Sequence, residues 1–307
     1  MKLSYAIIGT GALGGYYGGR LAHHGHDTHF LLHSDFEHVR EHGLKVDSVR
    51  GGFLLTPEQI QAYGHPTDLP ACDVTVVALK TTHNHLLPKL LQSSVSGGGV
   101  VLVLQNGLSP EADAAKIVGD DRVLGGLCFL CSNKVGPGHI DHSDYGHIHL
   151  GRYCDRVDPD IWQQIVADFN AADIETQAVD DLRLARWKKL AWNVPYNGLS
   201  VVLNQTTDQL MSGQESRSRV EALMKEVQAA ARAVDGRDLD DAFREKLLDY
   251  TAKMTPYKTS MMLDHEAGRP LETESIVGDP LRAAQAAGCD VPEMSRLYEQ
   301  LLAIDRG

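Results

Sequence analysis

Hydrophobic residues form short uninterrupted runs in the first part of the chain and recur at helical spacing in the second part. Residues 3–9 and Val100–Leu104 are apolar at nearly every position. Such runs are typical of strands that are buried on both faces of a parallel sheet. From Asp180 onward the strand patterns almost disappear, and long helical patterns follow one another. Strands first and helices later predict an N-terminal α/β domain, residues 1–180, and an all-helical C-terminal domain, residues 181–307.

The order of the predicted elements indicates a Rossmann-type, doubly wound sheet. An apolar run, a glycine turn, a helix and a second strand make one parallel βαβ unit at the N-terminus. Short β-like pieces between glycine turns in residues 122–151 predict added antiparallel strands. The other strands are expected at Asp27–His33, Lys45–Val46, Phe53–Leu55, Val74–Leu79 and Ile174–Ala178. Helices are expected near 84–94, 110–118 and 158–172, and then near 181–202, 214–234, 239–253, 256–266, 273–287 and 293–303.

A glycine turn follows the first predicted strand directly. Gly9, Gly11 and Gly14 complete the pattern G-x-G-x-x-G at the start of the βαβ unit. The first glycine permits a tight turn, the second lets a pyrophosphate approach the backbone, and the third lets the helix pack on the strand. N–H groups at the start of the helix bind the anion. The segment from Gly9 to Gly14, including Ala12 and Leu13, is therefore the predicted dinucleotide site.

The end of the second strand bears on the choice between the two nicotinamide dinucleotides. NAD usage generally requires an acidic residue there, which accepts hydrogen bonds from the ribose hydroxyls. Here the strand ends in Leu31-Leu32-His33-Ser34, and the first acid is Asp35. A histidine and a hydroxyl suit a 2′-phosphate, so the sequence favours NADP(H), with His33 as a contact. Two other interpretations stay open: His33 as a solvated loop residue, and Asp35 as a ribose contact.

Two further loops follow predicted strand ends, where an open α/β sheet binds its ligand. Lys80 follows Val74–Leu79, and Asn106 follows Val100–Leu104. Lys80 is expected to contact the cofactor or a substrate carboxylate, and Asn106 the nicotinamide ribose or the substrate. Either residue alone would more often be a solvated loop residue, but together and beside a glycine turn they are predicted site residues.

The helical half opens with a lysine and two asparagines at i, i+4 and i+8. Lys189, Asn193 and Asn197 share one face, because each step of four residues turns a helix by about 400°. A cationic donor beside two amides suits a small, oxygen-rich substrate that receives a proton. Pro195 lies within this helix, cannot donate to the Ala191 carbonyl, and is expected to kink the helix and re-aim Asn197.

A second group of polar residues lies near the C-terminus. Ser260 is expected on a helix that ends at Gly268, and Glu272 around the start of the next helix, with Thr273 as a candidate cap. A surface acid that favours a helix N-terminus is an equally good interpretation of Glu272.

These pieces together resemble the ketopantoate reductase (2-dehydropantoate 2-reductase) family over nearly the whole chain. Their order and spacing are far more specific than the glycine motif alone. The resemblance implies NADPH-dependent reduction of a 2-keto acid to a 2-hydroxy acid, which is a step of pantothenate biosynthesis if the substrate is ketopantoate. The matching segments are Gly9 to Gly14, Lys80-Thr81, Leu104 to Leu108, Trp187 to Asn197, and Ser260 to Glu272.

The resemblance also implies a role for each predicted site residue. Lys189 matches the general acid that protonates the carbonyl oxygen, and Glu272 matches an acid that hydrogen-bonds the substrate and the lysine region. The substrate-binding matches are Asn193, Asn197, Ser260 and Asn106, and the cofactor-binding matches include Lys80 and Asn106.

The chain departs from the family pattern at several of these segments. His33 stands where an arginine is expected for a 2′-phosphate, and Leu263 stands where a glutamine is expected. After Glu272 the chain reads Thr273 to Gly278 in place of the usual isoleucine-aspartate and asparagine-glycine pattern. These changes bear on the substrate and the cofactor preference more than on the reaction type.

Composition narrows the class of function. A net charge of -12 and a pI near 5.6 argue against a nucleic-acid or anionic-membrane surface. The absence of a signal-peptide pattern, of a membrane-length apolar stretch and of framework spacing among the five cysteines predicts a cytoplasmic protein. Cys128 and Cys131 are spaced as C-x-x-C, but residues i and i+3 of a strand point to opposite faces and serve neither a metal nor a disulfide well. Among the fifteen histidines, His147 and His149 could share a face, but no second pair has recognisable ligand spacing, so no metal site is predicted.

Two alternatives remain open. A related hydroxy-acid dehydrogenase would use the same architecture with NAD or with another keto acid. A nucleotide-sensing regulator would bind the dinucleotide and perform no chemistry, but it would not need Lys189 and Asn193 on one helix face. The helical domain suggests a homodimer in principle, although the sequence does not identify a partner face.

Overall fold

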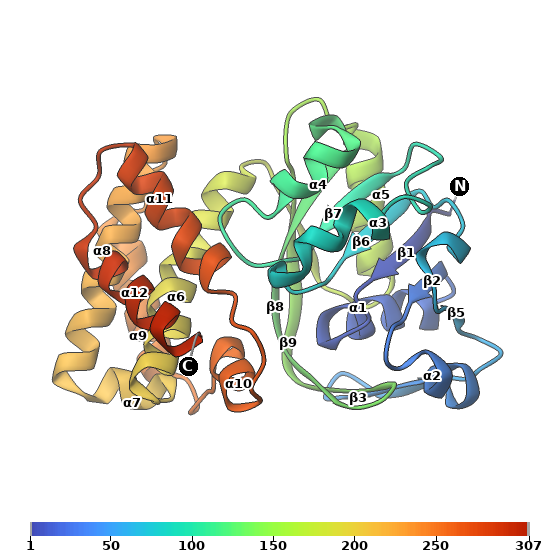
Figure 1. Cartoon of the computed structure of the whole chain (residues 1–307), viewed down its shortest axis with the longest axis horizontal. Helices are drawn as coiled ribbons and strands as arrows, with labels where there is room; N and C mark the ends of the chain where they lie inside the picture. Colours follow the sequence, from blue (N-terminus) through green and yellow to red (C-terminus); the bar gives the residue numbers. More distant parts are fainter. Residues whose placement is uncertain (1, 306–307) are drawn as a thin grey trace. The chain divides into compact units, whose positions relative to one another are not determined.

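The computed structural model describes residues 2–305, in two compact units. The sheet unit comprises residues 1–105 and 110–182, and the helical unit comprises residues 106–109 and 183–307. The predicted fold class, an α/β Rossmann-type domain followed by an all-helical domain, is confirmed (Figure 1). The sequence pattern did not predict that the short loop 106–109 packs with the helical unit, although it lies between two segments of the sheet unit in the chain.

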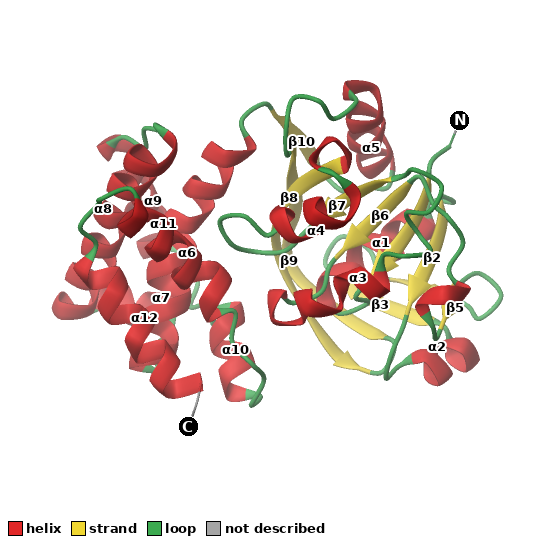
Figure 2. Ribbon diagram, turned by 45° about the horizontal axis from the view of Figure 1, so that its top comes forward, coloured by secondary structure: helices red, strands yellow, loops and turns green. Residues whose placement is uncertain are grey.

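The sheet unit is built on one ten-stranded sheet with the order β4-β3-β9-β8-β7-β6-β1-β2-β5, in which β10 pairs with β9 (Figure 2). Strands β2, β1, β6 and β7 are parallel neighbours. All four residues of β6 and of β7 are buried, as expected for strands covered on both faces. The strands are β1 Ser4–Ile8, β2 Asp27–Leu31, β3 Leu44–Ser48, β4 Phe53–Leu55, β5 Gln61–Tyr63, β6 Val74–Val77, β7 Val100–Val103, β8 Val123–Gly136, β9 His139–Arg152 and β10 Thr176–Val179.

The added antiparallel strands are a single long hairpin. β8 pairs with β9 along its whole length, with irregularities after Phe129, Cys131 and Lys134. Glycines inside these strands suggested several short pieces, but the ladder continues through them. The other sheet-unit elements are α1 Ala12–His23, α2 Phe36–His42, α3 Leu87–Leu90, α4 Glu111–Val118, α5 Pro159–Ala171, and the 3-10 turns η1 Pro66–Asp68, η2 Thr81–Leu86 and η3 Asp120–Arg122. α2, β5 and the short 3-10 turns η1 and η3 were not predicted.

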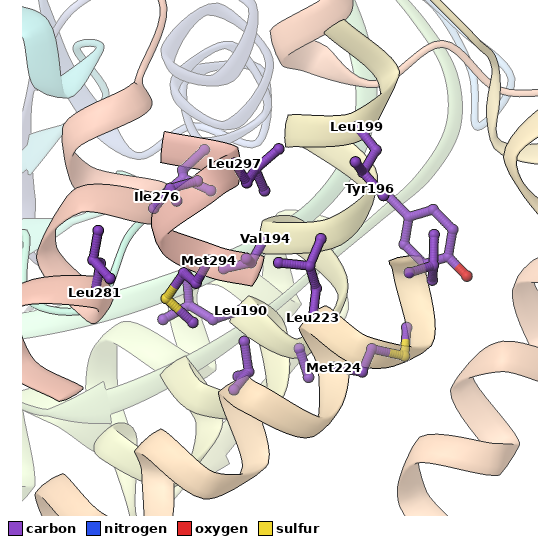
Figure 3. Close-up of a cluster of buried hydrophobic side chains, with 14 of the residues drawn as sticks. Leu190, Val194, Tyr196, Leu199, Leu223, Met224, Ile276, Leu281, Met294 and Leu297 are labelled. Carbon is purple, nitrogen blue, oxygen red and sulfur yellow. The ribbon is translucent and has the colours of Figure 1, made fainter. Parts of the chain in front are cut away.

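The helical unit packs its helices around one apolar core. Residues from α6, α8, α11 and α12 interdigitate there, including Leu190, Leu223, Leu281 and Leu297 (Figure 3). The apolar positions recur at helical spacing, so each helix turns one stripe into this core. The helices are α6 Leu182–Leu203, α7 Thr207–Ser212, α8 Gln214–Asp235, α9 Asp241–Lys253, α10 Ser260–Glu266, the π-helical η4 Glu274–Gly278, α11 Asp279–Ala286 and α12 Pro292–Asp305. The short helix α7 was not predicted, and α10 begins four residues later than expected.

Candidate functional site

The glycine turn joins β1 to α1 as predicted, and its three glycines have different surroundings. A Cβ on Gly9, whose φ is +94°, would lie 2.7 Å from the Leu79 nitrogen. A Cβ on Gly14 would lie 2.3 Å from the Gly9 carbonyl oxygen. A Cβ on Gly11 would meet nothing within 4 Å. Packing therefore requires Gly9 and Gly14, whereas Gly11 leaves open space where a phosphate group fits against the backbone.

The first turn of α1 suits an anion. Gly11 is the N-cap residue and has no side chain that could cap the helix, and the first turn contains no acidic residue. The first N–H groups of a helix have no partner within the helix, and the helix dipole favours negative charge there. Thr10 Oγ1 donates to the Leu31 carbonyl oxygen at 3.0 Å and ties the turn to the end of β2. The segment that contains Ala12 and Leu13 therefore fits the pyrophosphate of a dinucleotide.

Gln105, which follows β7, and the loop after β6 lie beside the glycine turn within the sheet unit. The Gln105 side chain donates to the Leu79 carbonyl oxygen at 3.0 Å, and Leu79 contacts Gly9 as described above. Lys80 is half-buried and precedes the 3-10 turn η2. Because β1, β6 and β7 are parallel neighbours, their carboxyl ends meet at one edge of the sheet.

Near the end of β2 lies Lys134, a residue of β8 that the sequence pattern did not indicate as a site residue. Asp35, the acid considered as a ribose contact, is buried and pairs with Lys134 Nζ at 2.6 Å. It also accepts from the Gly138 N–H at 2.9 Å. Burial raises the pKa of Asp35, but the hydrogen bonds from Lys134 and Gly138 outweigh it and hold the pKa below its ordinary value. His33 and Ser34 are exposed beside this pair. Lys134 lies in the β8–β9 hairpin, about 100 residues away in sequence, and no motif marks it.

The predicted lysine stripe lies on α6 in the helical unit. Lys189 Nζ donates to Asn106 Oδ1 at 2.9 Å. Two predicted site residues that are 83 positions apart in sequence therefore meet directly. Asn106 belongs to the loop that packs with the helical unit, which is why this contact exists within one unit.

The two asparagines of the stripe are buried, with exposed fractions of 6% for Asn193 and 2% for Asn197. Within residues 2–305, Asn197 Oδ1 has no hydrogen-bond partner. A buried amide oxygen without a partner is costly, and such groups occur at sites that receive a ligand. Helix α6 continues through Pro195 to Leu203, so the proline does not end the helix before Asn197.

Ser260 is the first residue of α10, and this helix is tied to α6. Ser200 Oγ and Thr259 Oγ1 lie 2.6 Å apart, and Ser200 Oγ also donates to the Asn197 carbonyl oxygen at 3.0 Å. Thr259 caps α10 by accepting from the Met262 N–H. Ser260 therefore directly follows Thr259, and Thr259 is linked through Ser200 to the Asn197 carbonyl group on α6.

Glu272 is buried and precedes the π-helical segment η4. Thr273 makes no capping hydrogen bond, so its predicted role as a cap is wrong. The segment that follows is π-helical: the Asp279 N–H donates to the Glu274 carbonyl oxygen with i+5 spacing, a form that is frequent at functional sites. Gly107 packs against this segment, since a Cβ there would lie 2.6 Å from the Ser275 carbonyl oxygen.

No metal centre accompanies these groups: in the described part of the chain, no cluster of three or more His, Cys, Asp or Glu side chains could hold a metal ion. His147 and His149 do lie together, with ring centroids 5.7 Å apart, and His147 stacks on Phe129. The five cysteines are free thiols. None of the helices within residues 2–305 combines the length and apolarity that a membrane span needs.

The sequence matches two family descriptions. Residues 5–154 match "Ketopantoate reductase PanE/ApbA", and residues 181–305 match its C-terminal description. A 2-dehydropantoate 2-reductase from Nostoc sp. is 54% identical over 305 residues, which cover 98% of this chain and 95% of that protein. The crystal structure of a 2-dehydropantoate 2-reductase from Geobacter metallireducens superposes with a TM-score of 0.94 at 38% identity, covering 98% of this chain and 99% of the other.

Two more distant structures share the fold alone. A D-mandelate dehydrogenase solved with NADH and anilino(oxo)acetate has a TM-score of 0.88 at 19% identity and covers 99% of this chain and 98% of its own. A dimeric ketopantoate reductase from Staphylococcus aureus has a TM-score of 0.83 at 20% identity and covers 99% of each chain.

An α/β sheet with open space at its glycine turn, and a helical unit whose helix α6 carries a lysine and two buried amides, are typical of dinucleotide-binding reductases, the class to which the similar solved structures belong. Two family matches that together span most of the sequence, and a relative with more than half of its residues identical, make the assignment specific. The chain belongs to the ketopantoate reductase family.

Proposed function

We propose that this protein reduces 2-dehydropantoate, or a similar 2-keto acid, to the 2-hydroxy acid with NADPH. With 2-dehydropantoate as substrate, the reaction belongs to pantothenate biosynthesis. The 54% identical Nostoc relative carries this name along nearly its whole length. The observation that carries the proposal is the hydrogen bond between Lys189 Nζ and Asn106 Oδ1. This bond holds the side chain of Lys189, the proposed proton donor, on the helix that also carries the buried amides of Asn193 and Asn197.

Reduction of a ketone adds a hydride to carbon and a proton to oxygen. The dinucleotide, when bound, supplies the hydride. The Lys189 ammonium stabilises the negative charge that develops on the carbonyl oxygen and then donates the proton to that oxygen. Asn106 accepts one hydrogen bond from Nζ at 2.9 Å and thereby fixes where the remaining N–H groups point.

The other predicted residues orient the substrate in this proposal. The amides of Asn193 and Asn197 hydrogen-bond the substrate oxygens, and the unpartnered Asn197 Oδ1 accepts from a substrate hydroxyl. Ser260 binds the carboxylate end. Glu272 accepts a hydrogen bond from the substrate, beside the lysine region. Burial of Asn193, Asn197 and Glu272 excludes water and strengthens their interactions.

For the cofactor, we infer a preference for NADP(H) over NAD(H). An acid at the end of β2 would serve a free ribose, but Asp35 is buried and bonded to Lys134 and Gly138. The exposed groups at this position are His33, Ser34 and the partly exposed Lys134 ammonium, which suit a 2′-phosphate. The NADH-bound D-mandelate dehydrogenase shows that this fold also accepts NADH, so NAD(H) is the alternative to test.

The activity is tested by following NADPH oxidation by the purified protein with 2-dehydropantoate and with a panel of other 2-keto acids. We expect 2-dehydropantoate to give the highest kcat/KM. A different preferred keto acid would identify a related hydroxy-acid dehydrogenase. Binding of NADPH without turnover of any keto acid would identify a nucleotide-sensing protein and contradict the proposal.

The cofactor preference is tested by titrating NADPH and NADH into the protein and its variants, with nucleotide fluorescence as the readout. We expect Lys134→Ala and His33→Ala each to weaken NADPH binding about three- to tenfold and to leave NADH binding unchanged, since only the 2′-phosphate loses a partner. Lys45→Ala is the matched control, because the exposed Lys45 side chain likewise pairs with an aspartate, Asp47. Equal loss for both nucleotides would remove these residues from the phosphate site.

A homodimer completes the proposal. It is supported by the dimer named for the Staphylococcus aureus protein of the same fold. Light scattering on the purified protein distinguishes a dimer from the 33.6 kDa monomer.

A further inference from the structure

An arginine without a role in the proposed mechanism holds the loop that carries Asn106. Arg183 on α6 donates from Nη1 to the Leu108 carbonyl oxygen at 3.0 Å and to Ser109 Oγ at 2.5 Å. Its Nε and Nη2 donate to Asp235 Oδ2 at 3.1 Å and 2.7 Å. A single planar guanidinium therefore joins the loop to the last residue of α8.

Asp235 is itself fixed by a second donor. The indole N–H of Trp187, a fully buried residue one turn after Arg183 on α6, donates to Asp235 Oδ2 at 2.6 Å. Gly236 ends α8 directly after this carboxylate, in the left-handed conformation with φ of +63°. A carboxylate that accepts from both an indole and a guanidinium is restrained in position, so it orients Arg183 as well as balancing its charge.

The remainder of the loop is held by the active-site residues. Gly107, with φ of +121°, packs against the Ser275 carbonyl, and Asn106 accepts from Lys189. Loop 106–109 is thus fixed at its start by the proton donor, in its middle by the segment after Glu272, and at its end by Arg183.

We propose that Arg183 and Asp235 form a positioning clamp that sets the Asn106 amide against Lys189. The catalytic consequence rests on the proposed function, in which Lys189 donates the proton. A loop released at Leu108 and Ser109 lets Asn106 leave Lys189 Nζ for part of the time. Misplacement of a catalytic group by about 1 Å costs up to roughly 10²-fold in rate. Arg183 acts through Asn106, so it is a positioning residue.

A double-mutant cycle tests the clamp. We expect Arg183→Ala to lower kcat about tenfold, with less than a twofold change in KM for NADPH. In an Asn106→Ala background, the same substitution should lower kcat less than twofold, because the amide that it positions is gone. Arg183→Lys, which keeps the charge and one donor, should recover part of kcat. Independent, multiplying effects of the two substitutions would overturn the proposal.

Arg232→Ala is the matched control. Arg232 lies on α8, and its exposed side chain pairs with Asp238, which follows the end of that helix. We expect its kcat to equal that of the unmodified protein. Melting temperatures of all variants separate a loss of folding from a loss of positioning.

Amide hydrogen exchange tests the clamp without using activity. We expect peptides that cover residues 106–109 to exchange faster in Arg183→Ala than in the unmodified protein or in Arg232→Ala. Unchanged exchange in this loop overturns the clamp. Faster exchange in a protein that reduces no keto acid would support the clamp and contradict the proposed function instead.

Discussion

The proposed dinucleotide site and the proposed substrate site are built from different groups. In the sheet unit, the proposed dinucleotide site is made of backbone: the N–H groups at the start of α1 and the space that Gly11 leaves open. In the helical unit, the site is made of side chains, with Lys189 held by Asn106 and Asn197 buried without a partner for its oxygen. The first site depends on the missing side chain at Gly11. The second depends on polar side chains, such as Lys189 and Asn106, that come from segments distant in sequence.

This difference decides how each half responds to substitution. If the proposal is correct, a side chain added at the glycine turn weakens nucleotide binding, and turnover falls with it. A side chain removed from α6 should stop turnover and leave nucleotide binding as it was. Substitutions in each unit therefore test whether nucleotide binding can be kept while turnover is lost.

The largest effect is expected at the proton donor. Lys189→Ala should lower kcat about 10³-fold and leave the dissociation constant for NADPH within about threefold, because general acids contribute about 10²- to 10⁴-fold. Stopped-flow turnover and nucleotide titration measure the two quantities. Lys188→Ala, which alters the adjacent exposed lysine, is the control and should keep its activity. If Lys189→Ala turned over normally, Lys189 would not be the proton donor.

The glycine turn gives the next largest effect and offers a matched pair. Gly11→Ala should fold normally, since a Cβ there meets nothing within 4 Å, and should weaken NADPH binding about tenfold or more. Gly14→Ala should lower the free energy of unfolding by about 1 to 3 kcal/mol, because its Cβ would lie 2.3 Å from the Gly9 carbonyl oxygen. Urea unfolding and nucleotide titration compare the two. Unaltered NADPH binding in Gly11→Ala would mean that the open space is not the pyrophosphate site.

The same difference explains what the sequence could predict. The glycine turn and the lysine stripe are local patterns, so spacing in the sequence was enough to predict that Gly11 starts a helix and that Asn197 shares a face with Lys189. The contacts of Lys134 and of Arg183 join residues more than 50 positions apart, and no local pattern encodes them. Thr273 was predicted wrongly as a cap because sequence does not distinguish a π-helical start from an α-helical one.

A smaller effect is expected at Asn197. Asn197→Ala should raise KM for the keto acid about tenfold, the loss of one good hydrogen bond, and should change the free energy of unfolding by less than about 1 kcal/mol. Its oxygen has no partner to lose within residues 2–305. Ser216→Ala provides the contrast: Ser216 is buried and donates to the Leu210 carbonyl, so this variant should lose stability and keep its KM. A large loss of stability in Asn197→Ala would make Asn197 a packing residue.

The smallest effect concerns Asp35, the acid that follows β2, and tests whether this carboxylate stabilises the fold. Its pKa is lowered in the folded protein, so the ionised carboxylate stabilises the fold above its unfolded pKa of about 3.9. This contribution is lost as the pH falls through the lower, folded pKa. Asp35→Asn should therefore reduce the free energy of unfolding by about 1 to 2 kcal/mol at pH 7. The difference from the unmodified protein should shrink below pH 4.

Urea unfolding at pH 7 and at pH 3 measures both differences, with Asp249→Asn on an exposed helix face as the control. A loss that is independent of pH would mean that the shape of the carboxylate, and not its charge, holds Lys134. If the Asp35→Asn variant instead kept its stability and lost nucleotide affinity, Asp35 would be a ribose ligand. The sheet unit would then use a side chain where its construction otherwise relies on backbone.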